Sequence, residues 1–356
     1  MLHPVFSFGP LRLAFVALLV IAGACGDSNQ TSPSDEGIAA GDPSTSAPVD
    51  SAAVPADSAT PAPDSIPPSV DSSQTDSTGV DELITSSGSG IPFGQNNLRA
   101  SSMTAMYNGT QLGITAPNFL NELRVARSKG GHFVQKMAGK RDEDIKNGDG
   151  TFSLTKWKNL VNGFKGLDFR SYITDGTLMG HFLIDEPENA SRWGGKAISQ
   201  ATVEEMARYS KQLWPTMPTF ARGRPSWLAK ATFQYNYLDA GWVQDYTFNK
   251  DVPAWIASES AAAKLKGLGM IVGIHVINGG DGSSGVRGTR TGKWNMSAAE
   301  IRTHGTTLLN EPRACAFLLY SYLDGGAEYM ARSDIKAAIT ELWNKSKSHL
   351  RTSCRQ

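Results

Sequence analysis

Strand-like and helix-like segments alternate along residues 91–356, and this alternation constrains the fold more than any other feature of the sequence. The short apolar runs have the length and composition of buried strands. They are residues 102–107, 132–137, 179–184, 218–221, 241–248, 270–277 and 314–323. The segments between and after them have helical periodicity. These are residues 117–128, 155–164, 203–213, 253–268, 298–309 and 327–350.

Such alternation predicts a parallel sheet covered by helices. We predict an α/β fold of the (β/α)8 TIM-barrel type, in which an eighth, degenerate strand lies within residues 163–172 or near Ile91. A doubly wound open sheet is the main rival, although no strand leads into a dinucleotide-binding fingerprint. Capping boxes of Thr202 with Glu205 and of Ser297 with Glu300 predict two helix starts.

The first 25 residues are typical of an export signal, with Arg12 before an apolar core and small residues before Cys25. The sequence Ala22-Gly-Ala-Cys25 resembles the lipobox of bacterial lipoproteins, although that family prefers a larger aliphatic residue where Ala22 stands. The resemblance implies lipidation of Cys25 and a protein held at the bacterial cell envelope, on the outer membrane or a periplasmic face. The alternative is a plain secreted protein cut near Cys25.

Residues 26–90 are rich in Ser, Thr, Pro, Ala and Asp, with few large apolar side chains. They cannot bury enough surface to offset the entropy of ordering, so we predict a disordered linker. The whole chain has 34 basic and 34 acidic residues, but residues 26–90 hold eleven acids and no Lys or Arg. One arginine precedes them, so residues 91–356 form a domain with 33 basic and 23 acidic residues and a net charge of about +10.

Export would place the remaining cysteines, Cys315 and Cys354, in an oxidising compartment. Cys315 opens the last predicted strand and Cys354 follows the last helix, so in a barrel both lie at the amino ends of the strands. We expect them to form a disulfide. The alternative is two buried or free thiols.

One strand ends abruptly in two carboxylates, in the sequence Gly180-His-Phe-Leu-Ile-Asp-Glu-Pro187. This segment resembles the fourth strand of glycoside-hydrolase-like TIM barrels, which often ends in Asn/Asp-Glu-Pro. The resemblance implies that Glu186 is a general acid, and an apolar rim would raise its pKa. Asp185 stands where many members have Asn. The alternative for these residues is the first turn of a helix, where Pro and acids are favoured.

Glycoside hydrolysis usually needs a second carboxylate. Neighbouring residues of a regular strand point to opposite faces, so Asp185 and Glu186 should not share one site. Asp324 and Asp245 are the main candidates for the partner, and Asp281 is a third. Asp324 could instead be a turn residue beside glycines, and Asp245 an ion-paired strand residue. The segment 270–278 lacks a Glu, which disfavours the standard retaining mechanism.

Aromatic faces stack on sugar rings, and polar or basic groups bind hydroxyls and carboxylates. The candidate substrate-binding residues are Tyr107, Lys136, Trp193, Arg222, Gln244, Tyr246, Asn278 and Tyr322. Trp242 and Trp294 are further aromatic candidates. The alternative for each aromatic residue is a place in the core, and for each charged residue a solvated surface position.

The leading hypothesis is a lipid-anchored monomer that hydrolyses glycosidic bonds of a polysaccharide or oligosaccharide without a cofactor. The alternative is a barrel that binds glycans without cleaving them, since one fold hosts many functions. A third hypothesis is a metal-dependent hydrolase that uses Asp185, Glu186 and His275, although the histidines lack ligand-like spacing. The scattered Lys and Arg residues do not form a nucleic-acid-binding motif.

Overall fold

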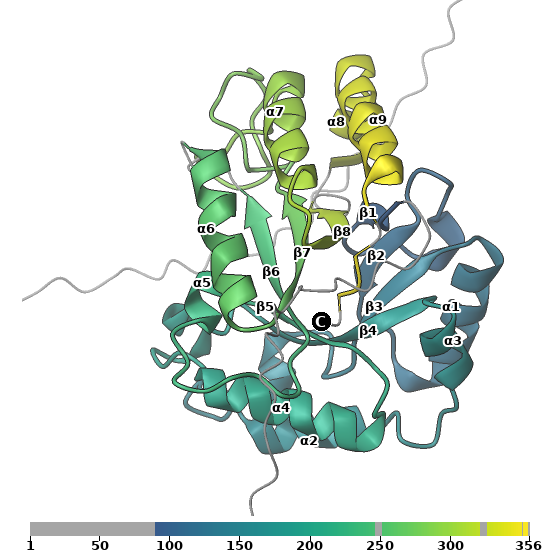
Figure 1. Cartoon of the computed structure of the whole chain (residues 1–356), viewed down its shortest axis with the longest axis vertical. Helices are drawn as coiled ribbons and strands as arrows, with labels where there is room; N and C mark the ends of the chain where they lie inside the picture. The colour runs from purple at the N-terminus through teal and green to yellow at the C-terminus, as the bar shows by residue number, and fades with distance from the viewer. Residues whose placement is uncertain (1–89, 246–250, 321–325, 351, 355–356) are drawn as a thin grey trace, which may run out of the picture. The chain divides into compact units, whose positions relative to one another are not determined.

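The computed structural model describes residues 90–245, 251–320, 326–350 and 352–354. Its strands are β1 (Phe93–Gln95), β2 (Gly109–Leu112), β3 (His132–Lys136), β4 (Leu178–Asp185), β5 (Thr219–Arg222), β6 (Ala240–Asp245), β7 (Gly269–Ile274) and β8 (Ala314–Leu319). They form a closed parallel barrel in chain order (Figure 1), with β1 pairing to β8. The predicted eight-stranded barrel is confirmed, and the open sheet is excluded. Cys25 and the predicted signal and linker segments, up to residue 89, lie outside the described residues.

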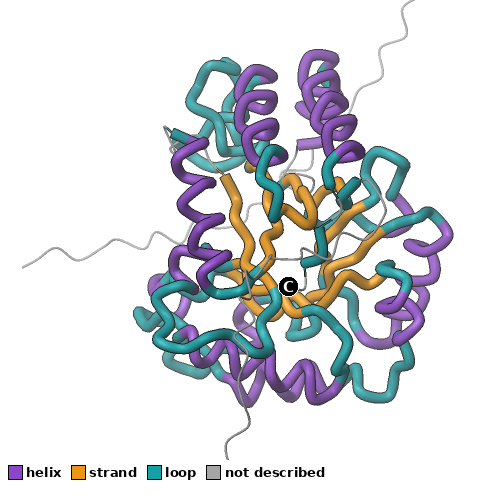
Figure 2. The backbone as a smooth tube through the Cα atoms, in the orientation of Figure 1, coloured by secondary structure: helices purple, strands orange, loops and turns teal. Residues whose placement is uncertain are grey.

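Helices surround the ring of strands (Figure 2). They are α1 (Ala116–Ser128), α2 (Leu154–Asn162), α3 (Arg170–Thr174), α4 (Gln200–Leu213), α5 (Pro225–Leu228), α6 (Val252–Leu265), α7 (Ala298–Leu309), α8 (Gly326–Ala331) and α9 (Ser333–Ser348). Short 3-10 turns are η1 (Ala100–Ser102), η2 (Asp142–Ile145) and η3 (Ala190–Trp193). The last predicted helix is therefore two helices, α8 and α9.

The eighth strand is β1, near Ile91, which is one of the two places predicted for it. The second strand differs most from the prediction: the strand expected at residues 102–107 is instead β2 at Gly109–Leu112. A Cβ on Gly94 would overlap the backbone oxygen of Gly109, so β1 and β2 approach too closely for a side chain. Glycine is normally depleted from strands, but here it permits close backbone contact. The prediction of a strand at residues 102–107 was wrong, because local propensity disfavours glycine and does not describe this contact between strands.

The two predicted capping boxes had different outcomes. Ser297 and Glu300 form a reciprocal capping box at the start of α7, as predicted. The start of α4 is earlier than predicted: its N-cap is Ser199, whose hydroxyl accepts the N–H of Thr202. Thr202 is therefore a residue within the first turn, and the box with Glu205 is wrong.

Two apolar layers support the barrel. Side chains in its interior pack on one another, and they include Val134, Phe182, Phe220, Trp242, Ile271 and Leu318. A second and larger cluster lies between the strands and the helices. The interior layer fills the barrel, so a ligand can enter only at an end of the strands.

The Cys315–Cys354 disulfide is formed, with 5.1 Å between the Cα atoms. The backbone of Cys354 lies against Gly269, the first residue of β7. The disulfide therefore lies at the amino ends of the strands, as predicted.

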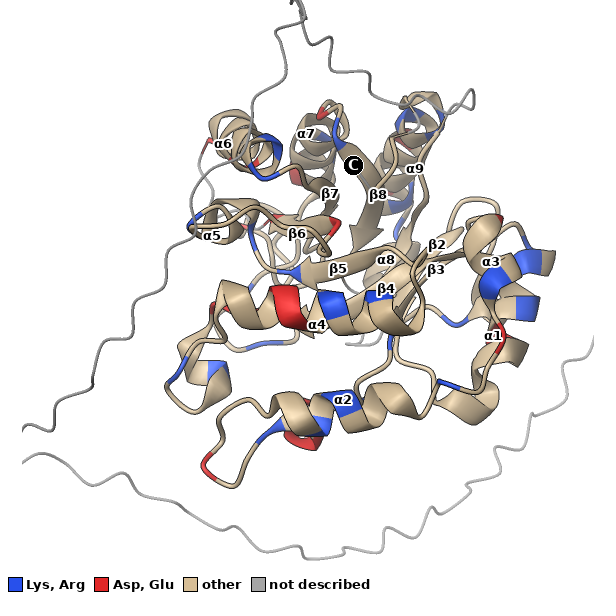
Figure 3. Cartoon of the chain, turned by 60° about the horizontal axis from the view of Figure 1, so that its bottom comes forward, with Lys and Arg blue, Asp and Glu red and all other residues tan. Residues whose placement is uncertain are grey.

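Lys and Arg residues are spread over several helices, among them α1, α2, α4 and α9 (Figure 3). Within the described parts of the chain, no helix is both long enough and apolar enough to cross a membrane.

Candidate active site

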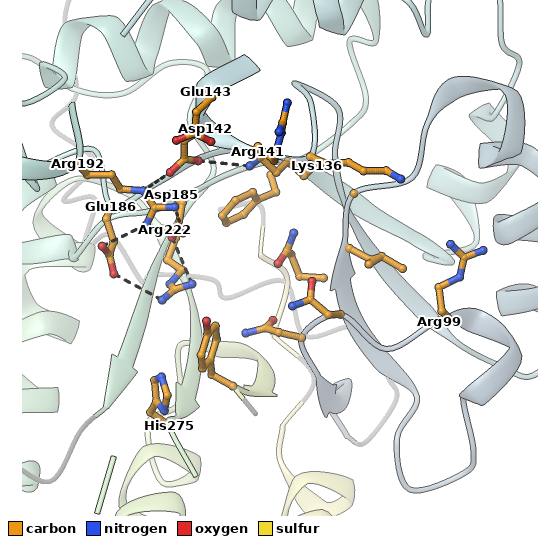
Figure 4. Close-up of a pocket in the computed structure, with 18 of the residues that line it drawn as sticks. Arg99, Lys136, Arg141, Asp142, Glu143, Asp185, Glu186, Arg192, Arg222 and His275 are labelled. Carbon is orange, nitrogen blue, oxygen red and sulfur yellow. Dashed lines mark hydrogen bonds and ion pairs between the residues drawn. The ribbon is translucent and has the colours of Figure 1, made fainter. Parts of the chain in front are cut away.

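A cavity of about 690 Å³ lies at the carboxyl ends of the strands (Figure 4). Barrel enzymes place their catalytic groups at this end. His275, proposed for the metal-dependent hypothesis, lines the cavity, and so do four of the residues proposed as catalytic or substrate-binding: Lys136, Asp185, Glu186 and Arg222. These four come from the ends of β3, β4 and β5, so the fold brings them together from three consecutive strands.

Glu186 adopts a left-handed backbone conformation, with φ of 46°. This region is unfavourable for residues other than glycine and persists only where the surroundings impose it. The N–H of Glu186 donates to the carbonyl oxygen of Arg222 at 2.8 Å. Its own carbonyl oxygen accepts from Nε1 of Trp193 at 3.0 Å and from the N–H of Asn189 at 3.1 Å. Three contacts therefore hold the strained turn in place.

This turn brings Asp185 and Glu186 to the same site. Arg192 contacts a carboxylate oxygen of Asp185 at 2.8 Å and one of Glu186 at 3.3 Å. Arg222 contacts the same two carboxylates at 3.3 and 3.7 Å. The expectation that they lie on opposite faces holds only for a regular strand, and it is wrong here because the strand ends in a left-handed residue.

A third acid completes the arrangement. Asp142, in η2, accepts from Nε of Arg192 at 2.5 Å and lies 3.6 Å from Nζ of Lys136. We call these six residues the carboxylate cluster: Asp142, Asp185 and Glu186 with Lys136, Arg192 and Arg222. Figure 4 shows the ion pairs that link them. Its three negative and three positive charges balance, so the cluster is nearly neutral. The ion pairs hold its side chains in place.

The cluster sets the protonation state of Glu186. Burial by itself would raise its pKa, but Arg222, the hydrogen bond from Asn189 and Arg192 outweigh this effect, and the pKa is lowered. The expectation of a raised pKa is therefore wrong, because arginines rather than apolar groups surround the carboxylate. Burial does raise the pKa of Glu188, which belongs to the same loop but not to the lining of the cavity. Glu186 is thus an ionised carboxylate at neutral pH.

Three side chains at the ends of β5, β7 and β8 lie close together beside the carboxylate cluster. The guanidinium of Arg222 lies 5.4 Å from the ring centre of Tyr320, and the rings of Tyr320 and His275 are 4.2 Å apart. Burial, reinforced by the positive charges of Arg222 and Arg290, lowers the pKa of His275 to about 3. His275 is therefore neutral and can donate or accept a hydrogen bond.

Asp245, proposed as a second catalytic acid, faces the helices. Its side chain is fully buried and contacts Nδ1 of His304 in α7 at 2.5 Å. It does not line the cavity. Inward-pointing Trp242 and Gln244 alternate with outward-pointing Val243 and Asp245, which explains the placement. Asp245 is a buried partner of His304 and lies outside the candidate site, which agrees with the alternative of an ion-paired strand residue.

Three candidate substrate-binding residues have other roles. Trp193 is fully buried and supports the backbone of Glu186, so it offers no face to a sugar. Tyr107 precedes β2, at the amino ends of the strands, and stacks on Phe93. Gln244 points into the barrel interior below the cavity, and its amide atoms have no hydrogen-bond partner in the described structure. None of the three lines the cavity.

The remaining described candidates are also structural. Asn278 accepts the N–H of Arg290 at 2.8 Å and donates to the hydroxyl of Thr289 at 3.0 Å, so it holds the loop after β7 rather than a ligand. Asp281 accepts the N–H of Ser283 in the same loop. Trp242 is buried in the barrel interior, and Trp294 stacks under the guanidinium of Arg287.

Asp324, Tyr246 and Tyr322 lie outside the described residues. Their proposed roles stay predictions.

Sequence reasoning missed Asp142, Arg192 and Tyr320, which line the cavity. Tyr320 directly follows β8, and its position at a strand end is a signal that could have identified it. Asp142 and Arg192 lie in loops and are 50 positions apart. No spacing rule relates them, because loop conformation alone brings them together.

Within the described ranges, no group of three or more His, Cys, Asp or Glu side chains is arranged to hold a metal ion. The trio of Asp185, Glu186 and His275 is therefore not assembled as a metal site in this structure.

Comparisons with known proteins found no matching family model and no matching curated protein. Among solved structures, the chain is similar to a hyperthermophilic endocellulase from the archaeon Pyrococcus horikoshii, with 12% identity, a TM-score of 0.45, and coverage of 68% of this chain and 83% of that one. It is also similar to Saccharomyces cerevisiae Gas2p in complex with laminaritriose and laminaritetraose, with 10% identity, a TM-score of 0.46, and coverage of 75% and 67%. Because these TM-scores are below 0.5, the site itself must support any functional assignment.

Proposed function

We propose that this protein acts on glycosidic bonds of a polysaccharide or oligosaccharide, with Glu186 as the reacting carboxylate. The main support is the conformation of Glu186: a strained, ionised residue at the carboxyl end of a barrel strand, held by three backbone contacts, with its side chain at the cavity. Strain of this kind clusters at functional sites, where the surroundings over-determine one geometry.

An ionised carboxylate between two arginines suits the role of nucleophile or general base in glycoside hydrolysis. It can attack the anomeric carbon or take a proton from water, but it cannot protonate the leaving oxygen while Arg192 and Arg222 hold it in the charged form. Hydrolysis also needs a proton donor. Asp324 is our candidate, since it follows β8, whose end borders the cavity through Tyr320.

A second function, glycan binding without cleavage, is favoured by the balance of the carboxylate cluster. Each of its three acids is already ion-paired. Ion pairs held in a fixed position can bind the hydroxyls of a saccharide without any step of catalysis. Under this proposal the cavity retains a saccharide, and Glu186 and Asp185 orient the arginines that bind it.

The sequence of residues 1–90 further leads us to propose export, lipidation at Cys25 and a position in the bacterial cell envelope. Metabolic labelling with a fatty-acid analogue tests this proposal, because Cys25→Ser should lose the label if Cys25 is the acylated residue.

The test of the main proposal is a screen of purified full chain against a panel of polysaccharides with detection of new reducing ends. Glu186→Gln should abolish turnover of a responsive glycan, while Glu341→Gln, in an exposed pair on α9, should leave the rate unchanged. If Glu186→Gln hydrolyses the glycan at the parental rate, Glu186 is not the reacting group. If the parent binds a glycan but releases no reducing ends from any, the binding function replaces the hydrolase proposal.

A further inference from the structure

Positive charge exceeds negative charge on the lining of the cavity. Among the described lining residues, seven are Lys or Arg and four are Asp or Glu. The carboxylate cluster uses three of each. The other acid, Glu143, is mostly exposed and lies 3.6 Å from Lys146. The remaining lining cations are Arg99, Lys140, Arg141 and Arg290. Arg99 pairs with Glu122 and Arg141 with Asp144, two acids outside the lining, so the surplus lies at Lys140 and Arg290.

The acids are also confined to one side of the cavity. All four lie on β4 or in the loops that follow β3 and β4. The lining contributed by β5, β7 and β8 and their loops consists of Arg222, His275, Arg290 and Tyr320, with no acid in the described part of the chain. We call these four residues the cationic arc. Arg222 also pairs with Asp185 and Glu186, so Arg290 supplies the positive charge that the arc adds to the carboxylate cluster.

Arg290 is positioned by its backbone. Its N–H donates to the side chain of Asn278, which is itself buried and left-handed, with φ of 77°. Gly288 permits this contact, since a Cβ there would overlap Oδ1 of Asn278. The guanidinium of Arg290 is exposed and pairs with no acid among the described residues. The loop thus fixes the backbone of Arg290 and leaves its guanidinium available to a ligand in the cavity.

A buried acceptor lies beside the cationic arc. The backbone N–H of Asn96 donates to the carbonyl oxygen of Leu319, which places Asn96 next to Tyr320. Asn96 lines the cavity and is 3% exposed, and its Oδ1 has no hydrogen-bond partner in the described structure. Buried acceptors are rarely left unsatisfied, so this atom indicates a place for a donor such as a ligand hydroxyl.

We propose that the saccharide bound in this cavity carries an anionic substituent, a carboxylate or a sulfate, and that the cationic arc binds it while Asn96 accepts a neighbouring hydroxyl. Arginine binds oxyanions through paired N–H donors, and an excess of positive charge on one side of a cleft favours anionic ligands there. Neutral His275 adds a hydrogen bond without repelling or attracting the anion. This inference rests on the proposed saccharide site and narrows its ligand class.

The test is a binding titration of the purified full chain at low and moderate salt. The probes are a galacturonic acid tetramer, a sulfated galactan tetramer and the neutral cellotetraose. We expect at least one anionic tetramer to bind about tenfold more tightly than cellotetraose, and this preference to shrink as salt screens the charges. The two anionic probes distinguish carboxylate from sulfate.

Arg290→Gln is the diagnostic variant, and Arg124→Gln is its control because it removes the same charge from an exposed position on α1. Arg290→Gln should weaken binding of the preferred anionic tetramer by about fivefold, the effect of one partly exposed charge pair. Arg124→Gln should leave it unchanged.

The outcomes separate this inference from the proposed function. Equal binding of anionic and neutral tetramers, or equal effects of the two variants, overturns the anionic ligand class, whether or not a neutral glycan is hydrolysed. Selective binding of an anionic tetramer, with no reducing ends released from any glycan of the panel, supports the ligand class and overturns the hydrolase proposal.

Discussion

Replacing Arg192 with methionine should destabilise the fold, because Arg192 is the cation shared by Asp142, Asp185 and Glu186. The change takes the charge of the carboxylate cluster from zero to minus one. Breaking a buried pair costs about 3–5 kcal/mol and breaking a surface pair about 0–1 kcal/mol. The side chain of Arg192 is 26% exposed. We therefore expect a loss of about 2 kcal/mol in the free energy of unfolding.

Thermal unfolding followed by circular dichroism measures this loss. About 2 kcal/mol corresponds to a fall in Tm of about 4–8 °C for a domain of this size. Arg302→Met, which breaks an exposed pair with Glu341, is the matched control and should lower Tm by less than about 2 °C. Adding Asp185→Asn to Arg192→Met restores the charge balance and should recover part of the loss.

The loss should also depend on pH. Arg192 helps to hold the pKa of Glu186 below its usual value of 4.5. A lowered pKa contributes stability that is present above the unfolded-state pKa and is lost as pH falls through the folded-state pKa. The gap in Tm between parent and Arg192→Met should therefore be full at pH 7 and shrink below about pH 4.5. A gap that is absent at pH 7, or that widens in acid, would refute the electrostatic account of the cluster.

Three further predictions follow from other parts of the fold. Cys315→Ser should lower the free energy of unfolding by about 4 kcal/mol, since the disulfide closes a loop of 39 residues. Reductant should lower the Tm of the parent and leave the Tm of Cys315→Ser unchanged. Asp245→Ala should lower the free energy of unfolding by about 3 kcal/mol, because it leaves His304 without its buried partner. The folded variant should still turn over a responsive glycan at 25 °C. Loss of turnover in the folded variant would return Asp245 to the catalytic candidates. Glu186→Gly should be about 1 kcal/mol more stable than Glu186→Ala, because only glycine relieves the left-handed backbone, and equal denaturation midpoints would show that the turn is not strained.

The sequence predicted most strands and helices because their apolar patterns reflect burial. For the eighth strand it left two places open, and β1 lies at one of them, near Ile91; three residues are too short a pattern to decide between the two. It failed at β2, which it placed at residues 102–107, because the local preference against glycine at Gly109 is outweighed by the close approach of Gly94. This error arises from a contact between strands, which local propensity does not describe.

The candidate site was predicted in part. Lys136, Asp185, Glu186 and Arg222 were identifiable because they end strands. The outward orientation of Asp245 follows from the two-residue period of β6. Other features depend on loop geometry: the left-handed turn at Glu186 cannot be read from its residue type.

The disulfide and the cavity lie at opposite mouths of the barrel, with the packed interior between them. An affinity tag, dye or surface linkage joined to the chain just beyond Cys354 would therefore face away from the opening that receives a ligand. Protein immobilised through that end should present the cavity to solution, which suits sensor-chip measurements with long, chain-like ligands.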